Sequence, residues 1–497
     1  MSKKLIIFGS LLSLLLAIAK PLPAQTSDDD IGTLTLEQCI SIAQDQSPVA
    51  NAARYALIAS KWENKSFNAD LLPSLSLTGN APNYRKSIFS NTLDNGDITF
   101  SSRTQSEAEV ELSIEQAILP TGGSLSLTTG LTRLGIFGGE NTYLWQSRPL
   151  VVGLRQPLFQ FNNLKWRNRL EPLRYEIAQK EFVEEMENIA LRVTNRFFDV
   201  YLAKINLENA KFNVTRNDSI YQISEGRYNV GSIAENDLLQ SELALRNAES
   251  SLTNARIEYN RLLNEFKILL GYSTDVELDL KPPEELPEIS VNIDKARQLA
   301  LKNNSESLNY KFREIQSDRD LARAKSEARL GLTLNAEYGL NQTSRDFADL
   351  YKDPENRQFI SLGFEVPIFN WGKQRAQINA ARNQQREVAN SIEYQRKQFI
   401  QQVDYTVSQF LQLRRQAQIS AQADTIARRR YQVAQNRYKI GKIDITNLFI
   451  AQDEKDSAKQ SYIQALRTFW TGWYELRKLT LYNFMKDEPI SYNLSNI

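Results

Sequence analysis

The side chains that most often carry out acid–base and metal chemistry are scarce in this 497-residue chain. It contains no histidine and a single cysteine, Cys39. Histidine is the commonest general base and the commonest metal ligand, so both roles would fall to other residue types. One cysteine cannot form an internal disulfide or a thiolate metal cluster. We therefore expect Cys39 to be a buried thiol on a helix.

Motifs for catalysis are also missing from the sequence. It contains no nucleophile elbow, no phosphate-binding loop and no metal-ligand cluster. An enzyme that uses carboxylates alone remains formally open. Because 60 basic residues balance 59 acidic ones, the chain has no net field that would attract nucleic acid. We predict a protein that is not an enzyme, binds no cofactor, metal or nucleic acid, and owes its function to its architecture.

The N-terminus is typical of an exported protein. Lys3 and Lys4 precede an apolar run over residues 5–19, and small residues follow. This pattern predicts a signal peptide over residues 1–24, with cleavage after Ala24 preferred and cleavage after Ala19 left open. No later segment reaches 18 consecutive apolar residues. We therefore expect the mature chain to be soluble or to enter a membrane as a β-barrel.

Four short segments recur in the same order, which indicates an internal duplication. Residues 36–38 and 75–77 return 257 positions later, at 293–295 and 332–334. Residues 153–159 and 228–231 return 210 positions later, at 363–369 and 438–441. The first copy therefore carries about 47 additional residues between Leu77 and Gly153. We expect repeat 1 over 25–280, a Pro-rich linker over 281–288, repeat 2 over 289–485 and a tail over 486–497.

Both copies contain segments in which apolar and polar residues alternate, over about 73–158 and about 330–367. Strands show this period of two when one face meets lipid and the other meets water. We predict that the polar residues between them line a lumen and that four apolar side chains of repeat 2 face lipid: Leu332, Leu334, Leu362 and Phe364. A half-buried hairpin in a soluble protein gives the same pattern.

Helical periodicity follows each strand region. The spans 162–228 and 372–438 are each 67 residues long, enough for a helix of about 100 Å. The spans 233–271 and 443–482 then carry apolar residues at alternating spacings of three and four, which predicts coiled-coil packing. A shorter helix precedes the strands in each copy.

The number of strands bears on the oligomeric state. Four alternating strands cannot close a barrel, and open sheet edges are not tolerated in lipid, so several chains would have to share one barrel. The 47 additional residues include a further alternating run over 110–118. They form either an extension of the hairpin outside the membrane or two added strands per chain, and the sequence leaves both open.

These features together resemble the TolC family of outer membrane factors over nearly the whole mature chain. The resemblance rests on two Pro-aromatic strand ends, residues 156–159 and 366–369, and on the paired turns 228–231 and 438–441, which precede Leu238-Leu239 and Leu448-Phe449. It implies a mainly α fold with membrane β: a homotrimer with a 12-stranded shared barrel in the cell outer membrane, continued by an α-helical tunnel across the periplasm. It also implies partnership with a periplasmic adaptor protein and an inner-membrane pump, in efflux or type I secretion.

The two Gly turns are expected to form the periplasmic tips, because glycine supplies the positive φ at which a helix ends and the chain reverses. The resemblance also makes the tip a gate and an adaptor-docking site. It assigns a latch to Asp237, with Tyr438 as partner and Lys442 in place of a basic residue that the family has one position later. The family's acidic ring is absent from this sequence: its positions are occupied by Asn447 and Ile450, with Asp453 one turn further on. The candidate tip residues are Tyr228, Gly231, Asp237, Tyr438, Gly441, Lys442, Asn447 and Asp453.

A periplasmic coiled-coil adaptor or structural protein is the alternative. In that interpretation the strands form a small soluble sheet. Adaptors usually have one helical hairpin flanked by compact β-domains, whereas this chain has two hairpins that alternate with alternating strands. The sequence therefore favours the channel.

Overall fold

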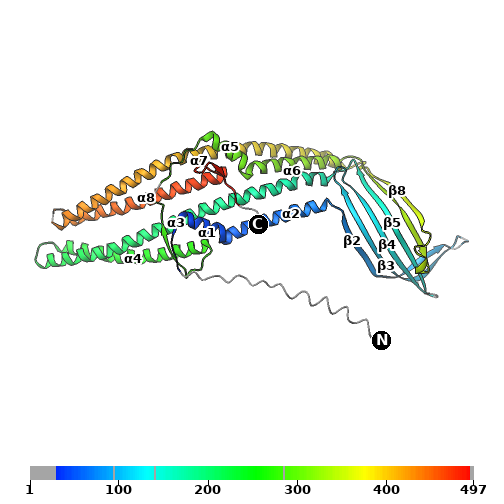
Figure 1. The fold of residues 1–497 in the computed structure, drawn as a ribbon, viewed down its shortest axis with the longest axis horizontal. Helices are drawn as coiled ribbons and strands as arrows, with labels where there is room; N and C mark the ends of the chain where they lie inside the picture. Colours follow the sequence, from blue (N-terminus) through cyan, green and yellow to red (C-terminus); the bar gives the residue numbers. More distant parts are fainter. Residues whose placement is uncertain are drawn as a thin grey trace, which may run out of the picture. The chain divides into compact units, whose positions relative to one another are not determined.

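The computed structural model describes residues 30–92, 94, 96–138, 141–283, 286–440 and 442–492 (Figure 1). The expected signal peptide and Gly441 lie outside the described residues. The chain divides into two compact units. Unit 1 comprises Met1–Ser47 and Val193–Glu285, and unit 2 comprises Pro48–Arg192 and Leu286–Ile497. Helix α3 (Asn163–Asn229) contributes to both.

Unit 1 contains β1 (Asp30–Thr35), α1 (Leu36–Gln46), the second half of α3, α4 (Glu235–Leu270) and β6 (Glu277–Lys281). Strands β1 and β6 pair in parallel. Thr35 begins α1 with a capping box, in which its hydroxyl accepts a hydrogen bond from the Gln38 amide. Fully buried Phe197 and Phe266, whose rings meet edge to face, form the core between α3 and α4.

The helices of unit 2 are α2 (Pro48–Asp70), the first half of α3, α5 (Ile293–Asn303), α6 (Ser305–Glu327), α7 (Lys373–Lys439) and α8 (Ile445–Thr480). Helices α7 and α8 form a long antiparallel hairpin (Figure 1). Its core contains Phe410, whose ring centroid lies 5.6 Å from that of Phe469 and 6.0 Å from that of Trp473. A Cβ on Gly472 would lie 2.6 Å from Leu413 Cδ1, so glycine permits the close approach of the two helices.

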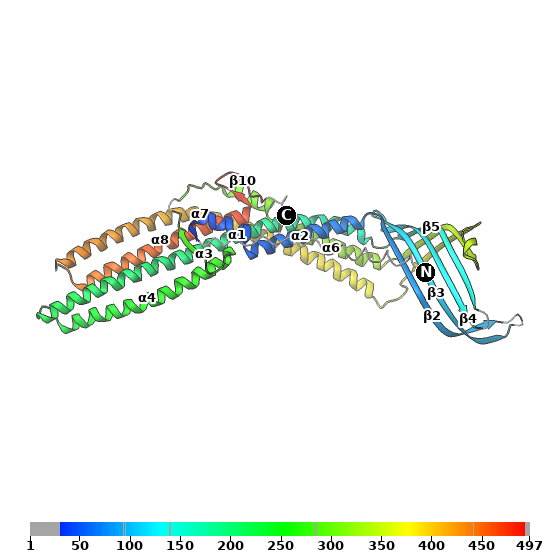
Figure 2. The same ribbon diagram turned by 60° about the horizontal axis from the view of Figure 1, so that its bottom comes forward.

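A single antiparallel sheet of unit 2 contains six strands in the order β2-β3-β4-β5-β7-β8. Figure 2 shows β2, β3, β4 and β5 side by side. Their bounds are Ser74–Thr92, Ile98–Ile118, Gly123–Phe137, Thr142–Leu158, Gly331–Ser344 and Glu355–Glu365. The expectation of four strands per chain is therefore wrong. The additional residues of repeat 1 do not form a separate ribbon, since they pair continuously with the other strands.

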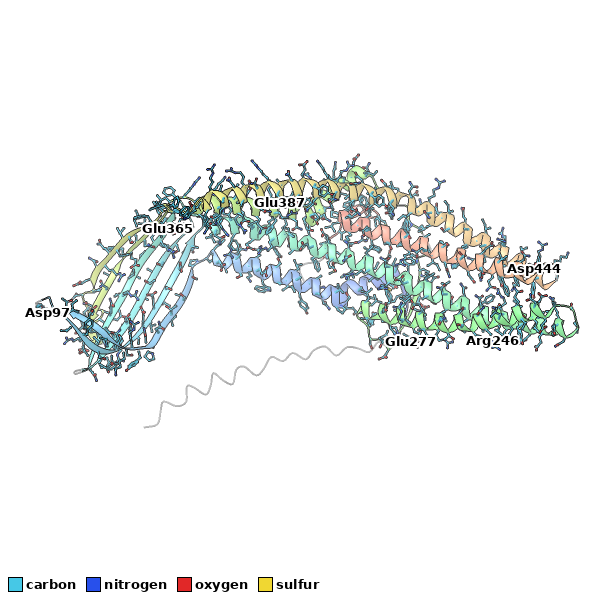
Figure 3. All side chains as sticks on the ribbon, turned by 180° about the vertical axis from the view of Figure 1, so that it is seen from behind. Asp97, Arg246, Glu277, Glu365, Glu387 and Asp444 are labelled. Atoms are coloured by element: carbon cyan, nitrogen blue, oxygen red, sulfur yellow. The ribbon has the colours of Figure 1, made fainter. Side chains whose placement is uncertain are left out.

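Short elements complete unit 2. The one-turn helix η1 (Phe347–Asp349) lies in the β7–β8 connection, and β9 (Tyr482–Asn483) pairs with β10 (Glu488–Pro489) after α8. In Figure 3, Glu365 lies where the sheet meets α7, and Asp97 lies at the opposite end of the sheet. Asp444 lies at the hairpin turn between α7 and α8. The helical hairpin and the outer strand ends thus mark the two ends of unit 2.

The duplication is visible in the helix lengths. Helices α1 and α5 each have 11 residues, α2 and α6 each have 23, α3 and α7 each have 67, and α4 and α8 each have 36. Repeat 1 has four sheet strands between its short and long helices, and repeat 2 has two. The difference in length between the repeats thus lies entirely in the sheet.

Candidate functional site

One face of the six-stranded sheet is apolar and solvent-exposed. The pairing places Leu332 opposite Phe364 and Leu334 opposite Leu362, so these four residues share that face. Leu362 is 56% exposed and Phe364 is 76% exposed. Exposure of aliphatic and aromatic side chains in such a row is unfavourable in water and favourable in lipid.

The opposite face is polar. Thr333, Asn335 and Glu337 lie there on β7, and Glu337 receives an ion pair from Arg357 of β8, with an Nη2–Oε2 distance of 2.8 Å. Thr333, Asn335 and Glu337 are half-buried, whereas Leu362 and Phe364 on the apolar face are exposed. Side chains on the concave face of a curved sheet crowd one another, so this is the face expected to line an aqueous lumen.

Both outer strands of the sheet are open. In the part of the chain that the structure describes, β2 pairs only with β3, and β8 pairs only with β7. Their outer edges therefore present rows of backbone N–H and C=O groups. Such edges cannot remain unpaired in a bilayer, and a further strand from another chain would satisfy them.

The turn between α3 and α4 is closed by backbone hydrogen bonds. The Gly231 amide donates to the Tyr228 carbonyl at 2.8 Å, and the Ser232 amide donates to the Arg227 carbonyl at 2.8 Å. Gly231 has φ +71°, which confirms its predicted left-handed conformation. Val230 beside it is 78% exposed. This tip therefore exposes an apolar side chain to solvent.

The α7–α8 turn repeats this arrangement. The Lys442 amide donates to the Arg437 carbonyl at 2.9 Å, the counterpart of the Ser232 bond. Asp444 is the N-cap of α8, and its Oδ1 accepts hydrogen bonds from the amide and the side chain of Asn447, at 2.8 and 2.9 Å. Asn447 therefore lies in the first turn of α8 and takes part in its N-cap. This contact does not depend on any role of Asn447 in a gate.

The other candidate tip residues are exposed or half-buried. Asp237 is exposed in the first turn of α4, where its charge also favours the helix dipole. Tyr438 is half-buried in the last turn of α7, and Lys442 and Asp453 are exposed. Asp237 belongs to unit 1, whereas Tyr438 and Lys442 belong to unit 2. The latch thus stays a prediction.

Sequence reasoning missed a buried ion pair in unit 2. Arg477 of α8 donates two hydrogen bonds to the carboxylate of Glu187 on α3, at 2.7 and 2.8 Å. The Glu187 side chain has no exposed area, and the Tyr492 hydroxyl donates to it at 2.9 Å. The pair therefore ties the C-terminal segment and α8 to the first half of α3.

Two titratable groups on the helices have pKa values raised by burial. Burial raises the pKa of the Cys39 thiol to about 12, as expected for an inert core cysteine. Burial also raises the pKa of Glu184, although Ser305 donates two hydrogen bonds to it at the start of α6. Among the described residues, no group of three or more acidic, His or Cys side chains is placed to hold a metal ion. No helix in the described ranges has the length and apolarity needed to cross a membrane.

Comparison with solved structures shows the same fold in outer membrane channels. The Campylobacter jejuni CmeC outer membrane channel matches with a TM-score of 0.66 and 14% identity, over 93% of this chain and 88% of that chain. The Vibrio cholerae outer membrane protein VceC matches with a TM-score of 0.63 and 13% identity, over 92% of this chain and 97% of that chain. The Neisseria gonorrhoeae MtrE outer membrane channel in its open state matches with a TM-score of 0.59 and 15% identity, over 90% of this chain and 88% of that chain. No curated protein sequence matches the chain significantly.

Comparison with protein families gives an assignment by sequence. The profile described as "Outer membrane efflux protein" matches residues 124–272 and 297–480, which together make up more than half of the chain. The two matched segments contain the long helical hairpin of each repeat. This match favours the channel over the adaptor alternative. The chain therefore belongs to the outer membrane efflux protein family and is an outer-membrane channel subunit with a TolC-like fold.

Proposed function

We propose that three copies of this chain form the exit duct of a tripartite assembly, in which an inner-membrane pump and a periplasmic adaptor deliver substrates for efflux or type I secretion. The duct gives substrates passive passage, and no catalytic step or cofactor belongs to the proposal. The energy for transport comes from the pump.

The open sheet edges are the observation that carries the proposal. One chain supplies an apolar outer face, and its sheet is open, because the two end strands β2 and β8 do not pair with each other. Pairing of β2 from one copy with β8 from the next satisfies both edges and generates a closed ring. The long helices then leave the ring as paired hairpins from each chain.

The helical turns are the proposed docking and gating end. Val230 and Ile440 are 78% and 67% exposed at the two turns, and they would contact the adaptor. Asp237 would contact Tyr438 or Lys442 across neighbouring hairpins when the tip is closed. Tyr228, Gly231, Gly441, Asn447 and Asp453 complete the proposed tip.

The assembly is tested by membrane fractionation followed by native mass spectrometry of the detergent-extracted protein. We expect outer-membrane fractionation and a mass of three mature chains. A monomer, or a protein found in the soluble periplasmic fraction, would contradict the proposal.

Adaptor docking is tested by a photo-crosslinking amino acid at Val230, in cells that also produce a candidate periplasmic adaptor protein. The matched control carries the same group at Asp97, at the far end of the sheet from the helices (Figure 3). We expect the adaptor to be captured at Val230 alone. Equal capture at both positions would exclude specific docking at the tip.

A further inference from the structure

The hairpin β3–β4 has no counterpart in repeat 2. Helices α2 and α6 both lead into a strand, β2 or β7, and β5 and β8 both lead into a long helix. Between these entering and leaving strands, repeat 1 has two more strands and repeat 2 has none. The family profile begins at residue 124, so β2 and β3 lie outside the matched segments.

The apolar face continues across the added strands without interruption. One row of paired residues runs from Leu75 of β2 through Ile114 of β3, Leu127 of β4 and Val152 of β5 to Tyr338 of β7. All five side chains are more than a third exposed. In a β-ribbon that extended into water outside the membrane, such a row of exposed apolar side chains would be unfavourable. Lipid contact along these five strands, the added β3 and β4 included, accounts for the row.

The polar face is joined across the same strands by an ion pair. Arg148 of β5 reaches over β4 to Glu109 and Glu111 of β3, with Nη2–carboxylate distances of 2.7 and 2.9 Å. Gly130 of β4 lies beneath it, where a Cβ would come within 3.0 Å of the guanidinium. The added hairpin is thus fitted to its neighbours on this face too.

The turn of the hairpin is fixed at the start of α3. Asn162 donates from Nδ2 to the carbonyls of Leu119 and Pro120, at 2.9 and 3.2 Å, while its Oδ1 accepts from the Lys165 amide and caps the helix. Gly122 has φ +74°, and a Cβ there would lie 3.0 Å from Asn162 Cγ. The equivalent position before α7, where there is no such turn, is Gly372. The β3–β4 turn therefore lies at the same level as the strand–helix junction.

We infer that β3 and β4 are membrane-spanning strands, so that the shared barrel has eighteen strands, six from each of three chains. The inference rests on the trimer proposed above. Because barrel diameter grows roughly linearly with strand number, this barrel is about one and a half times as wide as one of twelve strands. Barrels of about 16–18 strands enclose an open aqueous channel. The helical hairpins are not increased in number, so the extra width is confined to the outer-membrane exit.

The test is spin-label accessibility in the full chain, reconstituted in lipid. Single cysteines at Leu112 and Leu127 probe the apolar face of the added hairpin, and Ser113 and Thr128 are their matched controls on the polar face. Leu362 on β8 is the reference for lipid contact. The native Cys39 can remain, because its buried thiol with a pKa of about 12 reacts slowly.

We expect labels at Leu112, Leu127 and Leu362 to collide more with oxygen, which partitions into lipid, than with a water-soluble nickel chelate. Labels at Ser113 and Thr128 should show the reverse. Water exposure at Leu112 and Leu127, with Leu362 in lipid, would overturn the eighteen-strand barrel and leave the proposed channel intact. Water exposure at Leu362 as well would overturn the shared membrane barrel itself.

Discussion

The two repeats agree in their helices and differ in their strands. All four helix pairs have equal lengths, the longest at 67 residues each, whereas the sheet takes four strands from one repeat and two from the other. In the proposed tunnel, helices that end at a common tip must match in length, since a single extra residue shifts the end of a helix by about 1.5 Å and turns its side chains by about 100°. Strands added around a ring change its circumference but not its height. The channel can therefore vary its barrel more freely than its tunnel.

Equivalent positions in the two helical hairpins also have different partners. Arg477 forms the buried pair with Glu187, whereas Lys267, the matching residue of repeat 1, donates from Nζ to the Thr274 carbonyl at 2.8 Å. Ala234 and Asp444 occupy matching N-cap positions, and only Asp444 makes a side-chain cap. The same backbone scaffold is thus stabilised differently in each repeat.

The largest expected effect comes from breaking the buried pair. Glu187→Ala leaves Arg477 without its charge partner and should lower the free energy of unfolding by about 3–5 kcal/mol. The matched change in repeat 1, Lys267→Met, removes one hydrogen bond and should cost about 0.5–1.5 kcal/mol. Urea denaturation followed by far-UV circular dichroism measures both. Equal losses would show that the contrast between the repeats has no energetic meaning.

Proline substitution tests whether the two coiled-coil helices contribute alike. Ala255 of α4 and Ala465 of α8 are equivalent and both are half-buried. Either Ala→Pro change removes a helix hydrogen bond and should cost about 3 kcal/mol or more. Thermal unfolding of the two variants should show similar losses. If only one variant were destabilised, the two hairpins would not be equivalent elements of the tunnel.

Exchanging the N-cap residues of α8 and α4, Asp444 and Ala234, tests the difference between the two helix starts. Asp444→Ala should destabilise the start of α8 by about 0.5–2 kcal/mol. Ala234 already has N-cap geometry, with φ −78° and ψ 157°, so Ala234→Asp should stabilise α4. The gain should be smaller than the loss, because Glu235 and Asp237 already place negative charge in that turn. Hydrogen exchange at the amides of Asn447 and Asp237 reports each change, and an unaltered rate in both would exclude the capping account.

The smallest effect is expected at the tip. An exposed contact of Asp237 with Tyr438 or Lys442 contributes about 0–1 kcal/mol, repeated in each chain of the trimer. The double variant Asp237→Ala, Tyr438→Phe should raise single-channel conductance in planar bilayers by favouring the open tip. Tyr405→Phe, which changes an exposed tyrosine of α7 outside the proposed tip, serves as the control and should leave conductance unaltered. Unchanged conductance in the double variant would remove the latch but not the channel.

The sequence predicted the long helices well because their signals are local and duplicated. The turns at Gly231 and Gly441 are 210 residues apart, and the apolar stripes around them contain one proline, Pro172. These signals locate α3, α4, α7 and α8 to within a few residues. The strand count was not predictable, because the alternation of Val110, Leu112 and Ile114 is the same in a membrane strand and in an exposed ribbon. What distinguishes them is pairing with β4 and the contacts of Asn162 with a turn more than 40 residues away.

The buried pair was equally hidden from sequence reasoning. Glu187 and Arg477 are 290 residues apart, and each stands in a helix rich in charged residues that remain exposed. No periodicity marks them as partners. At the tip, the family resemblance aligned Asn447 with a position of the acidic ring, and it gave no sign of the hydrogen bonds that Asn447 forms with Asp444.

The central claim is that several copies of this chain complete one barrel through their open edges. Single-particle electron microscopy of the detergent-extracted protein tests it directly by counting chains and strands. We expect three chains around one barrel, with β2 of each paired to β8 of the next and eighteen strands in all. A single chain that closes its own barrel, or a sheet whose β2 and β8 edges meet no other copy, would contradict it.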